Sequence, residues 1–156
     1  MSPAFRRATV ADAPLLAAHR ARVWEEVGEW SPTAMAAQTP VWEDFVRRAI
    51  ADGTYVAVIA EADGTPVASG AMLVQPAMPR PELPGSERCG RVQSVYVEPL
   101  ARKRGIARGL MHELLDAARA LRLIFLSLHP SDEARALYAS LGFTPADEMG
   151  LRLIEE

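Results

Sequence analysis

The chain has 156 residues, of which 49% are hydrophobic and 24% are charged, and its formal net charge is −3 at pH 7. This length suits a single domain spanning residues 1–156 with a buried core, and the apolar content excludes an intrinsically disordered chain. The net negative charge argues against nucleic acid as a partner, because binding to a phosphate backbone needs a basic surface.

Cysteine content and hydropathy bear on the compartment of the protein. The single cysteine, Cys89, allows no internal disulfide and indicates neither a zinc nor a redox site, so we expect no metal. No apolar run approaches the roughly 20 residues that a membrane span needs, and no signal-peptide pattern precedes the first predicted strand. We therefore expect a cytoplasmic protein that does not act at a membrane.

The first third of the chain is predicted to form one strand and two helices. Residues 5–8 have the composition of a short strand, and Thr9 with Asp12 resembles a capping box that begins a helix. This helix is expected to end near Gly28. Its predicted core-facing positions are Leu15, Leu16, His19, Val23 and Trp24.

Residues 29–38 are predicted to form a loop between the two helices. The second helix is predicted to begin at Thr39 and Pro40, with Thr39 as N-cap and Pro40 at the first helical position. Gly53 is a suitable residue to end this helix, because glycine readily adopts the left-handed conformation at a helix C-terminus.

A β-hairpin is predicted next. Residues 54–60 and 67–74 have strand composition and flank Asp63-Gly64, a dipeptide typical of two-residue hairpin turns. Residues 76–90 contain several prolines and glycines and are predicted to form a long surface loop. Residues 91–97 are rich in β-branched and aromatic side chains, and we expect a strand that stops at the following proline.

A basic glycine turn joins this strand to a helix. The pattern Arg102-x-x-Gly105-x-Ala107 precedes apolar residues at three- and four-residue spacing, as in an amphipathic helix that continues to Leu121. Such a junction directs unpaired backbone N–H groups and the positive end of a helix dipole to one point. The sequence therefore predicts a site for a phosphate-bearing ligand. The basic side chains around it are Arg102, Lys103, Arg104 and Arg108.

The remainder is predicted to contain a strand, a helix and a last strand. Residues 123–128 form an almost continuous apolar run, typical of a strand that is covered on both faces. Ser131 is a suitable N-cap for a helix that ends at Leu141, and Gly142 follows it. Residues 148–154 are predicted to form the last strand.

The element order and two short motifs resemble those of the GCN5-related N-acetyltransferase (GNAT) superfamily. The first motif is VYVEPxxRxxGIA at residues 95–107, which is similar to the acetyl-coenzyme A (acetyl-CoA) loop of that superfamily. The second is AxxLYxxLGF at residues 134–143, which is similar to its C-terminal helix. The resemblance implies a mixed α/β fold, in which a central and mostly antiparallel sheet is flanked by about four helices.

The resemblance also implies an activity. It implies an enzyme that uses acetyl-CoA as co-substrate and transfers the acetyl group directly to a primary amine of a small molecule, peptide or protein. The alternative is a non-catalytic module of the same fold that binds acyl-CoA as a sensor. Cys89 lies outside both motifs, so no acyl-enzyme is expected. Homodimers are common in the superfamily, and the resemblance is compatible with one.

Individual residues receive roles from the resemblance. The turn would bind the pyrophosphate of the coenzyme, and the backbone of the preceding strand would pair with its pantetheine arm. Tyr138 would stabilise the departing thiolate. Proton transfer from a phenol of pKa near 10 to a thiolate of pKa near 8.5 is unfavourable by roughly 2 kcal/mol, so a hydrogen bond or a lowered phenol pKa fits better than full transfer. The expected coenzyme-binding residues are Val95, Tyr96, Val97, Arg102, Lys103, Arg104, Gly105, Ile106, Ala107, Arg108, Ser131 and Ala134.

The sequence leaves the general base open. An amine with a pKa of about 10.4 is almost entirely protonated at pH 7, so some group must accept its proton before it attacks. The candidates are Glu25, Glu26, Glu29, Glu98, His129 and a water relay. Trp30, in the predicted loop, is a candidate for the wall of the acceptor site.

Overall fold

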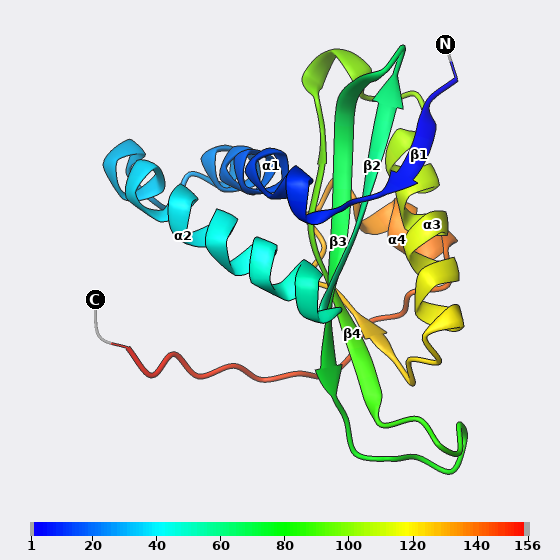
Figure 1. The fold of residues 1–156 in the computed structure, drawn as a ribbon. Helices are drawn as coiled ribbons and strands as arrows, with labels where there is room; N and C mark the ends of the chain where they lie inside the picture. Colours follow the sequence, from blue (N-terminus) through cyan, green and yellow to red (C-terminus); the bar gives the residue numbers. More distant parts are fainter. Residues whose placement is uncertain (1, 155–156) are drawn as a thin grey trace.

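The computed structural model describes residues 2–154, which form one five-stranded sheet with helices on both faces (Figure 1). The strands are adjacent in chain order, from β1 (Ala4–Arg7) through β2 (Tyr55–Ala62), β3 (Thr65–Pro76) and β4 (Arg88–Val97) to β5 (Leu126–Ser127). Neighbouring strands are antiparallel except β4 and β5, which are parallel. The predicted mixed and mostly antiparallel sheet is therefore confirmed.

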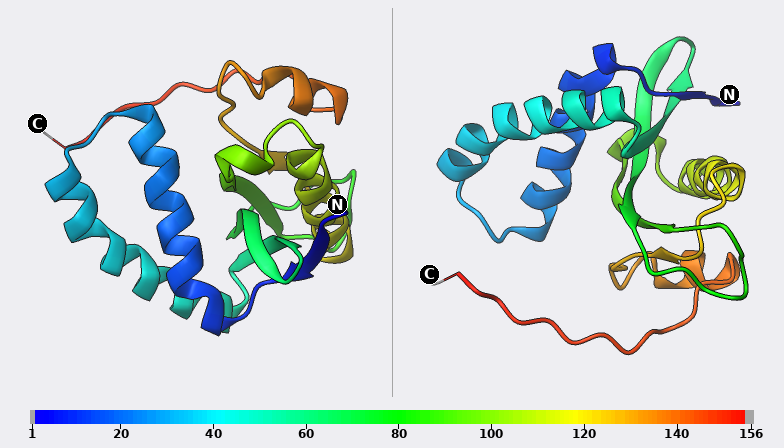
Figure 2. Two further views of the ribbon diagram at one scale, coloured as in Figure 1. Left: turned by 90° about the horizontal axis from the view of Figure 1, so that it is seen from above. Right: turned by 60° about the horizontal axis from the view of Figure 1, so that its bottom comes forward.

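The helices lie on the two sides of this sheet (Figure 1, Figure 2). α1 (Ala13–Val27) and α2 (Pro32–Asp52) pack side by side on one face. α3 (Ile106–Ala120) covers the opposite face, and the short α4 (Arg135–Ser140) lies on the same side as α3. Within residues 2–154, none of the helices is both long and apolar enough to cross a membrane.

Each face of the sheet carries its own core. In β2, Val58 packs in the cluster under α3, whereas the next residue, Ile59, packs in the cluster under α1 and α2. Both side chains are almost completely buried. The alternation explains why β2 is apolar along nearly its whole length, since successive side chains of a strand point to opposite faces.

The predicted hairpin and a bulge shape the middle of the sheet. Asp63 and Gly64 connect β2 to β3 with φ angles of 51° and 77°, the two positive angles that a type I′ turn needs. Between β3 and β4 the register shifts beside Gly70, and Ser94 adopts a φ of 55°. β4 therefore bulges near Ser94, and such bulges redirect side chains close to functional sites.

The first helix is capped as predicted. A short 3-10 turn (Val10–Asp12) precedes α1, and the Asp12 carboxylate accepts a hydrogen bond from the Thr9 backbone N–H at 2.7 Å. The helix ends at Gly28, which has a φ of 74°. The predicted helix boundaries in this part of the chain are thus confirmed.

The second helix begins earlier than predicted. Its N-cap is Ser31, whose Oγ accepts a hydrogen bond from the Ala34 backbone N–H at 3.1 Å, and its first residue is Pro32. Residues 32–38 are therefore helical, and the predicted loop over residues 29–38 and the predicted start at Thr39 are wrong.

Two competing start signals explain this difference. Ser31-Pro32 and Thr39-Pro40 both place a capping residue before a proline, and the helix begins at the first of them. Thr39 lies in the helix interior and donates from its hydroxyl to the Met35 carbonyl at 2.8 Å. The extra turns bury Met35 beside Trp42, and this packing offsets the hydrogen bond that Pro40 cannot make.

The strands around the second predicted loop also differ in length from the prediction. β4 begins at Arg88 instead of residue 91, which shortens the loop. β5 is limited to Leu126–Ser127 instead of residues 123–128. The backbone N–H of Leu123 bonds to the carbonyl of Ala118 in α3, so the start of the apolar run is tied to that helix.

The predicted last strand, over residues 148–154, does not form. This segment runs away from the body of the molecule in an extended conformation (Figure 1, Figure 2). Met149 and Leu153 are 99% and 88% exposed. β5 has only two paired residues, so in the described part of the chain it offers no ladder on which a further strand could add.

Candidate functional site

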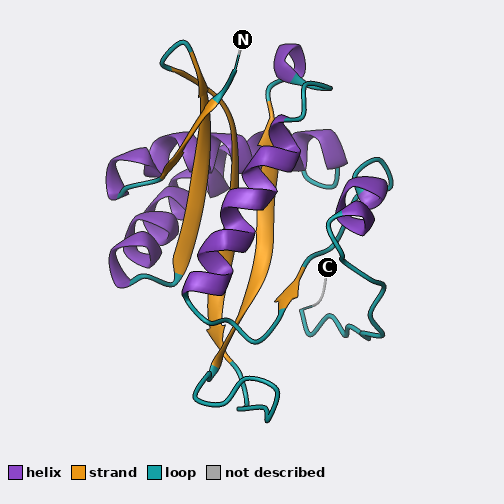
Figure 3. Cartoon of the chain, turned by 90° about the vertical axis from the view of Figure 1, so that its right-hand side faces the viewer, coloured by secondary structure: helices purple, strands orange, loops and turns teal. Residues whose placement is uncertain are grey.

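The edge of β4 that faces β5 is open over most of its length. The two strands pair only at Gly90 with Leu126 and at Arg91 with Ser127, and β5 then diverges from β4 (Figure 3). From residue 92 to 97, β4 has no strand partner on this side among the described residues. Open backbone N–H and C=O groups of this kind bind an extended ligand in the manner of an added strand.

Val95, Tyr96 and Val97, predicted to bind the pantetheine arm, lie on this open stretch. The side chains of Val95 and Val97 pack against the core under α3, whereas Tyr96 contacts the α1 side through His19. The side chains are therefore engaged in packing on the two faces, and it is the backbone that remains for a ligand.

The turn after β4 presents the beginning of α3. After a 3-10 turn (Pro99–Ala101), Lys103 and Gly105 adopt φ angles of 61° and 77°, and Gly105 is the N-cap of α3. No side chain caps this helix, so its first backbone N–H groups have no side-chain acceptor. Together with the helix dipole, these groups form an anion-binding position. Ile106 is buried and Ala107 is half-buried immediately behind it.

Two of the four predicted phosphate-binding side chains are already engaged elsewhere. Arg102 donates from Nε to the Val97 carbonyl at 2.9 Å and forms an ion pair with Glu26 of α1. Arg108 donates to Ser140 Oγ at 2.9 Å and connects α3 to α4. These contacts indicate that Arg102 and Arg108 brace the turn, whose backbone provides the anion-binding groups.

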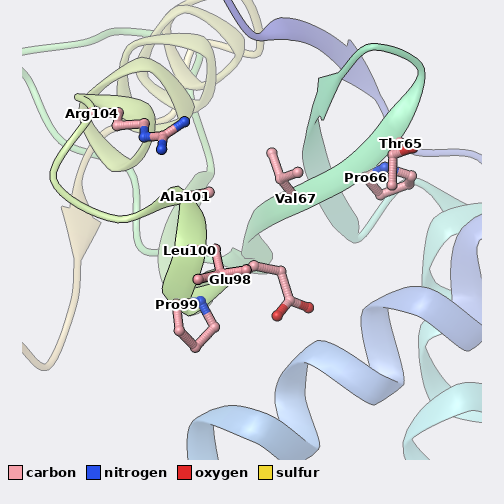
Figure 4. A pocket seen from close by; sticks show the side chains of 8 residues that line it. All are labelled: Thr65, Pro66, Val67, Glu98, Pro99, Leu100, Ala101 and Arg104. Carbon is pink, nitrogen blue, oxygen red and sulfur yellow. The ribbon is translucent and has the colours of Figure 1, made fainter. Parts of the chain in front are cut away.

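Lys103 and Arg104 are the two exposed basic side chains that remain. Neither forms a salt bridge with any carboxylate of the described residues. Arg104 borders an open depression of about 730 Å³ (Figure 4). The depression lies on the β3 side of the turn, opposite to the open β4 edge, so it adjoins the predicted coenzyme path instead of coinciding with it. It is lined by Thr65, Pro66, Val67, Glu98, Pro99, Leu100, Ala101 and Arg104.

Tyr138 lies in α4 with its ring edge-on to Phe143, at a centroid distance of 5.8 Å. It is 9% exposed, and its hydroxyl has no hydrogen-bond partner within residues 2–154. Burial raises the pKa of this phenol above its ordinary value. A raised pKa favours the role of hydrogen-bond donor for Tyr138 over the alternative of a lowered phenol pKa.

The N-terminal approach to α4 holds the last two predicted coenzyme contacts. Ser131 Oγ accepts a hydrogen bond from the Ala134 backbone N–H at 3.3 Å, which closes a turn before the helix. The N-cap of α4 is Ala134, so the predicted N-cap at Ser131 is wrong. Ala134 is partly buried and lies one helical turn before Tyr138. Its methyl group adds little bulk beside the phenol.

The opposite face of β4 carries a polar network that the sequence did not predict. The buried His19 Nδ1 lies 2.7 Å from Ser69 Oγ, and His19 Nε2 lies 3.7 Å from Glu98 Oε1. Tyr96 donates from its hydroxyl to Glu98 Oε2 at 3.3 Å. Burial lowers the pKa of His19, against a smaller raising effect of Glu98, so His19 is neutral near pH 7.

Next to this network, Arg20 lies among aromatic rings. Its guanidinium is 5.8 Å from the Trp24 ring centroid and 5.1 Å from that of Trp42, and Nη1 donates to Ser94 Oγ at 2.9 Å. Trp30 stacks at 4.4 Å from Trp24. The helical spacing placed Trp24 in the core, but a charged side chain among these rings had no sequence signal, because the contacts join α1, α2 and β4.

The candidate general bases differ in position and in exposure to solvent. Glu98 is turned toward α1 (Figure 4) and its side chain is 41% exposed. Glu26 is paired with Arg102. The other three candidates, Glu25, Glu29 and His129, are exposed. Among residues 2–154, no group of three or more His, Cys, Asp or Glu side chains is placed to hold a metal ion.

Comparison with known proteins agrees with this geometry. The model of the acetyltransferase (GNAT) family matches residues 16–143. A GCN5-related N-acetyltransferase of Ralstonia eutropha JMP134 is 27% identical, with a TM-score of 0.86 over 97% of this chain and 99% of its own. A predicted acetyltransferase of Clostridium acetobutylicum, crystallised with acetyl-CoA, is 25% identical, with a TM-score of 0.85 over 97% of each chain.

A more distant structure shows the same fold. Glucosamine-6-phosphate N-acetyltransferase of Arabidopsis thaliana is 14% identical, with a TM-score of 0.68 over 99% of this chain and all of its own. A search of the curated proteins found no match. The family match covers most of the chain, including the open β4 edge, the glycine turn and α4, and the chain therefore belongs to the GCN5-related N-acetyltransferase family.

Proposed function

We propose that this protein transfers the acetyl group of acetyl-CoA directly to a primary amine of an acceptor. The observation that carries the proposal is the continuous path from the open edge of β4 through the Gly105 turn to the uncapped start of α3. An extended ligand with a pyrophosphate at one end fits this path. When bound, acetyl-CoA would supply an activated thioester.

The proposed coenzyme site uses mainly backbone. Residues 95–97 would pair with the pantetheine arm, and the N–H groups of residues 105–108 would bind the pyrophosphate. Lys103 and Arg104, which are free of salt bridges with the described carboxylates, would add positive charge beside it. Ser131 and Ala134 would border the arm from the α4 side.

Direct transfer is favoured over an acyl-enzyme because Cys89 is badly placed as a nucleophile. Cys89 pairs with Gln75 near the start of β4, eight residues before Val97. Cys89 therefore lies outside the open stretch of β4, beyond the point where Gly90 pairs with Leu126 of β5. None of the ring nitrogens of His19, His112 or His129 is within hydrogen-bond distance of Cys89.

Glu98 is the proposed general base and would act through a water relay, because it follows Val97 at the turn end of β4, whereas the thioester would lie beyond Val95, toward the bulge. It lies on the α1 side of β4, where it attracts a protonated amine, and its carboxylate is accessible to solvent for the onward release of the proton. Glu26 is less suited because its negative charge is compensated by Arg102.

A thermal-shift titration with acetyl-CoA, coenzyme A and ATP tests the coenzyme site. A ligand at 100 times its Kd stabilises the folded protein by about 2.7 kcal/mol, which gives a measurable rise in Tm. We expect both coenzymes, but not ATP, to raise the Tm. Absence of any shift would contradict the proposal, and a shift without turnover on a broad amine panel would favour the acyl-CoA sensor.

Replacement of Tyr138 by phenylalanine tests the chemical step. We expect Tyr138→Phe to lower kcat by about 10²-fold or more, because the departing thiolate loses its hydrogen-bond donor. The acetyl-CoA-induced Tm shift should stay close to that of the wild type, since the phenol contributes little to binding of the coenzyme. An unchanged kcat would remove Tyr138 from the mechanism, and the Tm without ligand controls for damage to the fold.

A further inference from the structure

The guanidinium of Arg20 occupies a position between two helices and the central strand. It extends from α1 between the indole rings of Trp24 and Trp42 and reaches Ser94 at the bulge of β4. Trp30 adds a third indole, 4.4 Å from Trp24 and 6.2 Å from Trp42 by ring centroids. Arg20 therefore lies in a half-buried cage of aromatic rings.

No carboxylate neutralises this cation. Among residues 2–154, no Asp or Glu oxygen lies within 4.0 Å of Arg20, whereas Arg6 and Arg102 each have an acidic partner. Of its five N–H donors, one is satisfied by Ser94 Oγ within the described part of the protein. The neighbouring Tyr55 phenol stays neutral, since burial raises its pKa to about 12 against the opposing effects of Arg20 and Ser94.

A half-buried arginine among aromatic rings has either a structural role or a role in binding an anion. It can be a structural residue that is held in place by cation–π contacts with the two indole rings. It can also bind an anion, because a half-buried charge without a counter-ion costs free energy. A carboxylate would accept two parallel hydrogen bonds from the guanidinium group. No buried side-chain nitrogen or oxygen of the described residues lacks a hydrogen-bond partner, so the remaining Arg20 donors are open to solvent, and an anion that enters the cage can reach them. This accessibility favours the binding of an anion.

The location of this cage ties it to the acceptor. Ser94 and Tyr96 of β4, and Glu98 directly after the strand, alternate along the chain and are directed toward α1, on the face opposite to the α3 core. Arg20 is at the bulge end of this row, and the proposed base Glu98 is at the other end, roughly 13 Å away at 3.3 Å per residue, so Glu98 would receive the proton of an acceptor held at Arg20 through water. A molecule with a carboxylate at Arg20 would thus place its amine beside the strand that is proposed to hold the thioester.

We propose that Arg20 binds the carboxylate of the acceptor, and that the acceptor is an amino acid whose apolar or aromatic side chain packs against Trp24, Trp30 and Trp42. This proposal rests on the acetyl transfer proposed above and narrows its substrate. A guanidinium fork also binds phosphate bidentately, so a phosphate-bearing amine is included in the test.

Matched amines test the proposal by activity. L-Leucine and L-phenylalanine are compared with isopentylamine and phenethylamine, which lack only the carboxylate, and with O-phosphoethanolamine. We expect kcat/KM to be at least tenfold higher for each amino acid than for its decarboxylated analogue. Arg20→Gln should remove this preference by raising KM for the amino acids, and Arg20→Lys, which keeps the charge but not the fork, should retain part of it.

The fluorescence of the protein gives a readout that is independent of turnover. Of the three tryptophans in the chain, Trp24 and Trp42 contact Arg20, and Trp30 stacks on Trp24. Titration with L-leucine should change the tryptophan emission saturably in the wild type and in the control Arg48→Gln, an exposed α2 residue paired with Asp44. Arg20→Gln should lose the response, and inorganic phosphate should not reproduce it.

The outcomes separate the two proposals. Acetylation of amines without a carboxylate preference, and without an Arg20-dependent fluorescence change, would overturn the Arg20 inference and leave the acetyltransferase intact. A saturable, Arg20-dependent response without acetylation of any amine would support the carboxylate site and contradict the proposed transfer. A stronger response to phosphate or O-phosphoethanolamine would overturn the choice of carboxylate.

Discussion

At the scale of single residues, the unusual feature is a polar pair on the inner side of α1. His19 is buried against Ser69, and Arg20 reaches between indoles to Ser94. Both side chains occupy the interface with the sheet, where an ordinary amphipathic helix places apolar residues. The helix therefore serves as one wall of a polar site as well as a packing surface.

The burial of His19 predicts a pH-dependent stability. Because burial lowers the folded-state pKa of His19, the unfolded chain binds the proton more readily as the pH falls below the ordinary value near 6.5. The free energy of unfolding should therefore decrease as the pH falls through 6.5, until the pH passes below the folded-state pKa. Above 6.5 this contribution is fully present.

His19→Asn isolates this effect, because the amide can still bond to Ser69 but does not titrate. We expect the Tm of the wild type to fall more steeply between pH 7 and pH 5 than the Tm of the variant. Asp12 does not interfere in this window, since its hydrogen bond with Arg6 lowers its pKa below the ordinary 3.8. Parallel Tm profiles of the two proteins would contradict the assignment.

At the scale of elements, the start of α2 gives a sharp test of capping. Ser31 Oγ accepts the Ala34 N–H, so Ser31→Ala should lower the free energy of unfolding by about 1 kcal/mol. Thr39→Ala should cost less than half of that, because the Thr39 hydroxyl bonds to a carbonyl inside the helix. Urea denaturation of both variants measures the difference. Equal losses, or a larger loss for Thr39→Ala, would place the cap where the sequence alone suggested.

Elements defined by local chemistry were predictable from the sequence. The Asp63-Gly64 turn and the Gly105 junction depend on backbone conformations that their own residues favour, and both were predicted correctly. The N-cap of α2 was missed because two equivalent signals competed and tertiary packing of Met35 decided between them. The length of β5 depends on a partner strand and has no local signal.

The candidate site also contains features that the sequence predicts and features that it does not. The sequence motifs located the turn and Tyr138, because these features follow one another along the chain. The engagement of Arg102 with Glu26 could not be predicted, since the two residues are 76 positions apart. For Arg20 the partners come from α2 and β4, so only the folded arrangement shows that its charge is uncompensated.

At the scale of the whole molecule, the sheet divides the proposed functions between its faces and its edge. The coenzyme path follows the open edge of β4, and the acceptor side lies under α1 and α2. The α3 face is filled by a continuous apolar cluster. β4 is the one strand in the described part of the chain that contributes to the coenzyme path, the polar network and the aromatic cage.

The extended C-terminal segment does not pack against either face of the sheet. Met149, Leu151, Leu153 and Ile154 are between 74% and 99% exposed. Glu148 lies 4.0 Å from Arg91, a surface contact that contributes about 1 kcal/mol or less. The segment thus adds apolar surface without adding to either core.

Removing residues 149–156 should therefore change the free energy of unfolding by less than about 1 kcal/mol, and it should leave acetyl-CoA binding unchanged. Because exposed apolar side chains promote association, the truncated protein should also self-associate less in sedimentation velocity experiments over a range of concentrations. A loss of several kcal/mol on truncation would show instead that the segment packs as a strand in solution. If that loss grew smaller with dilution of the intact protein, the sheet receiving the strand would belong to a second copy of the chain, as in a homodimer.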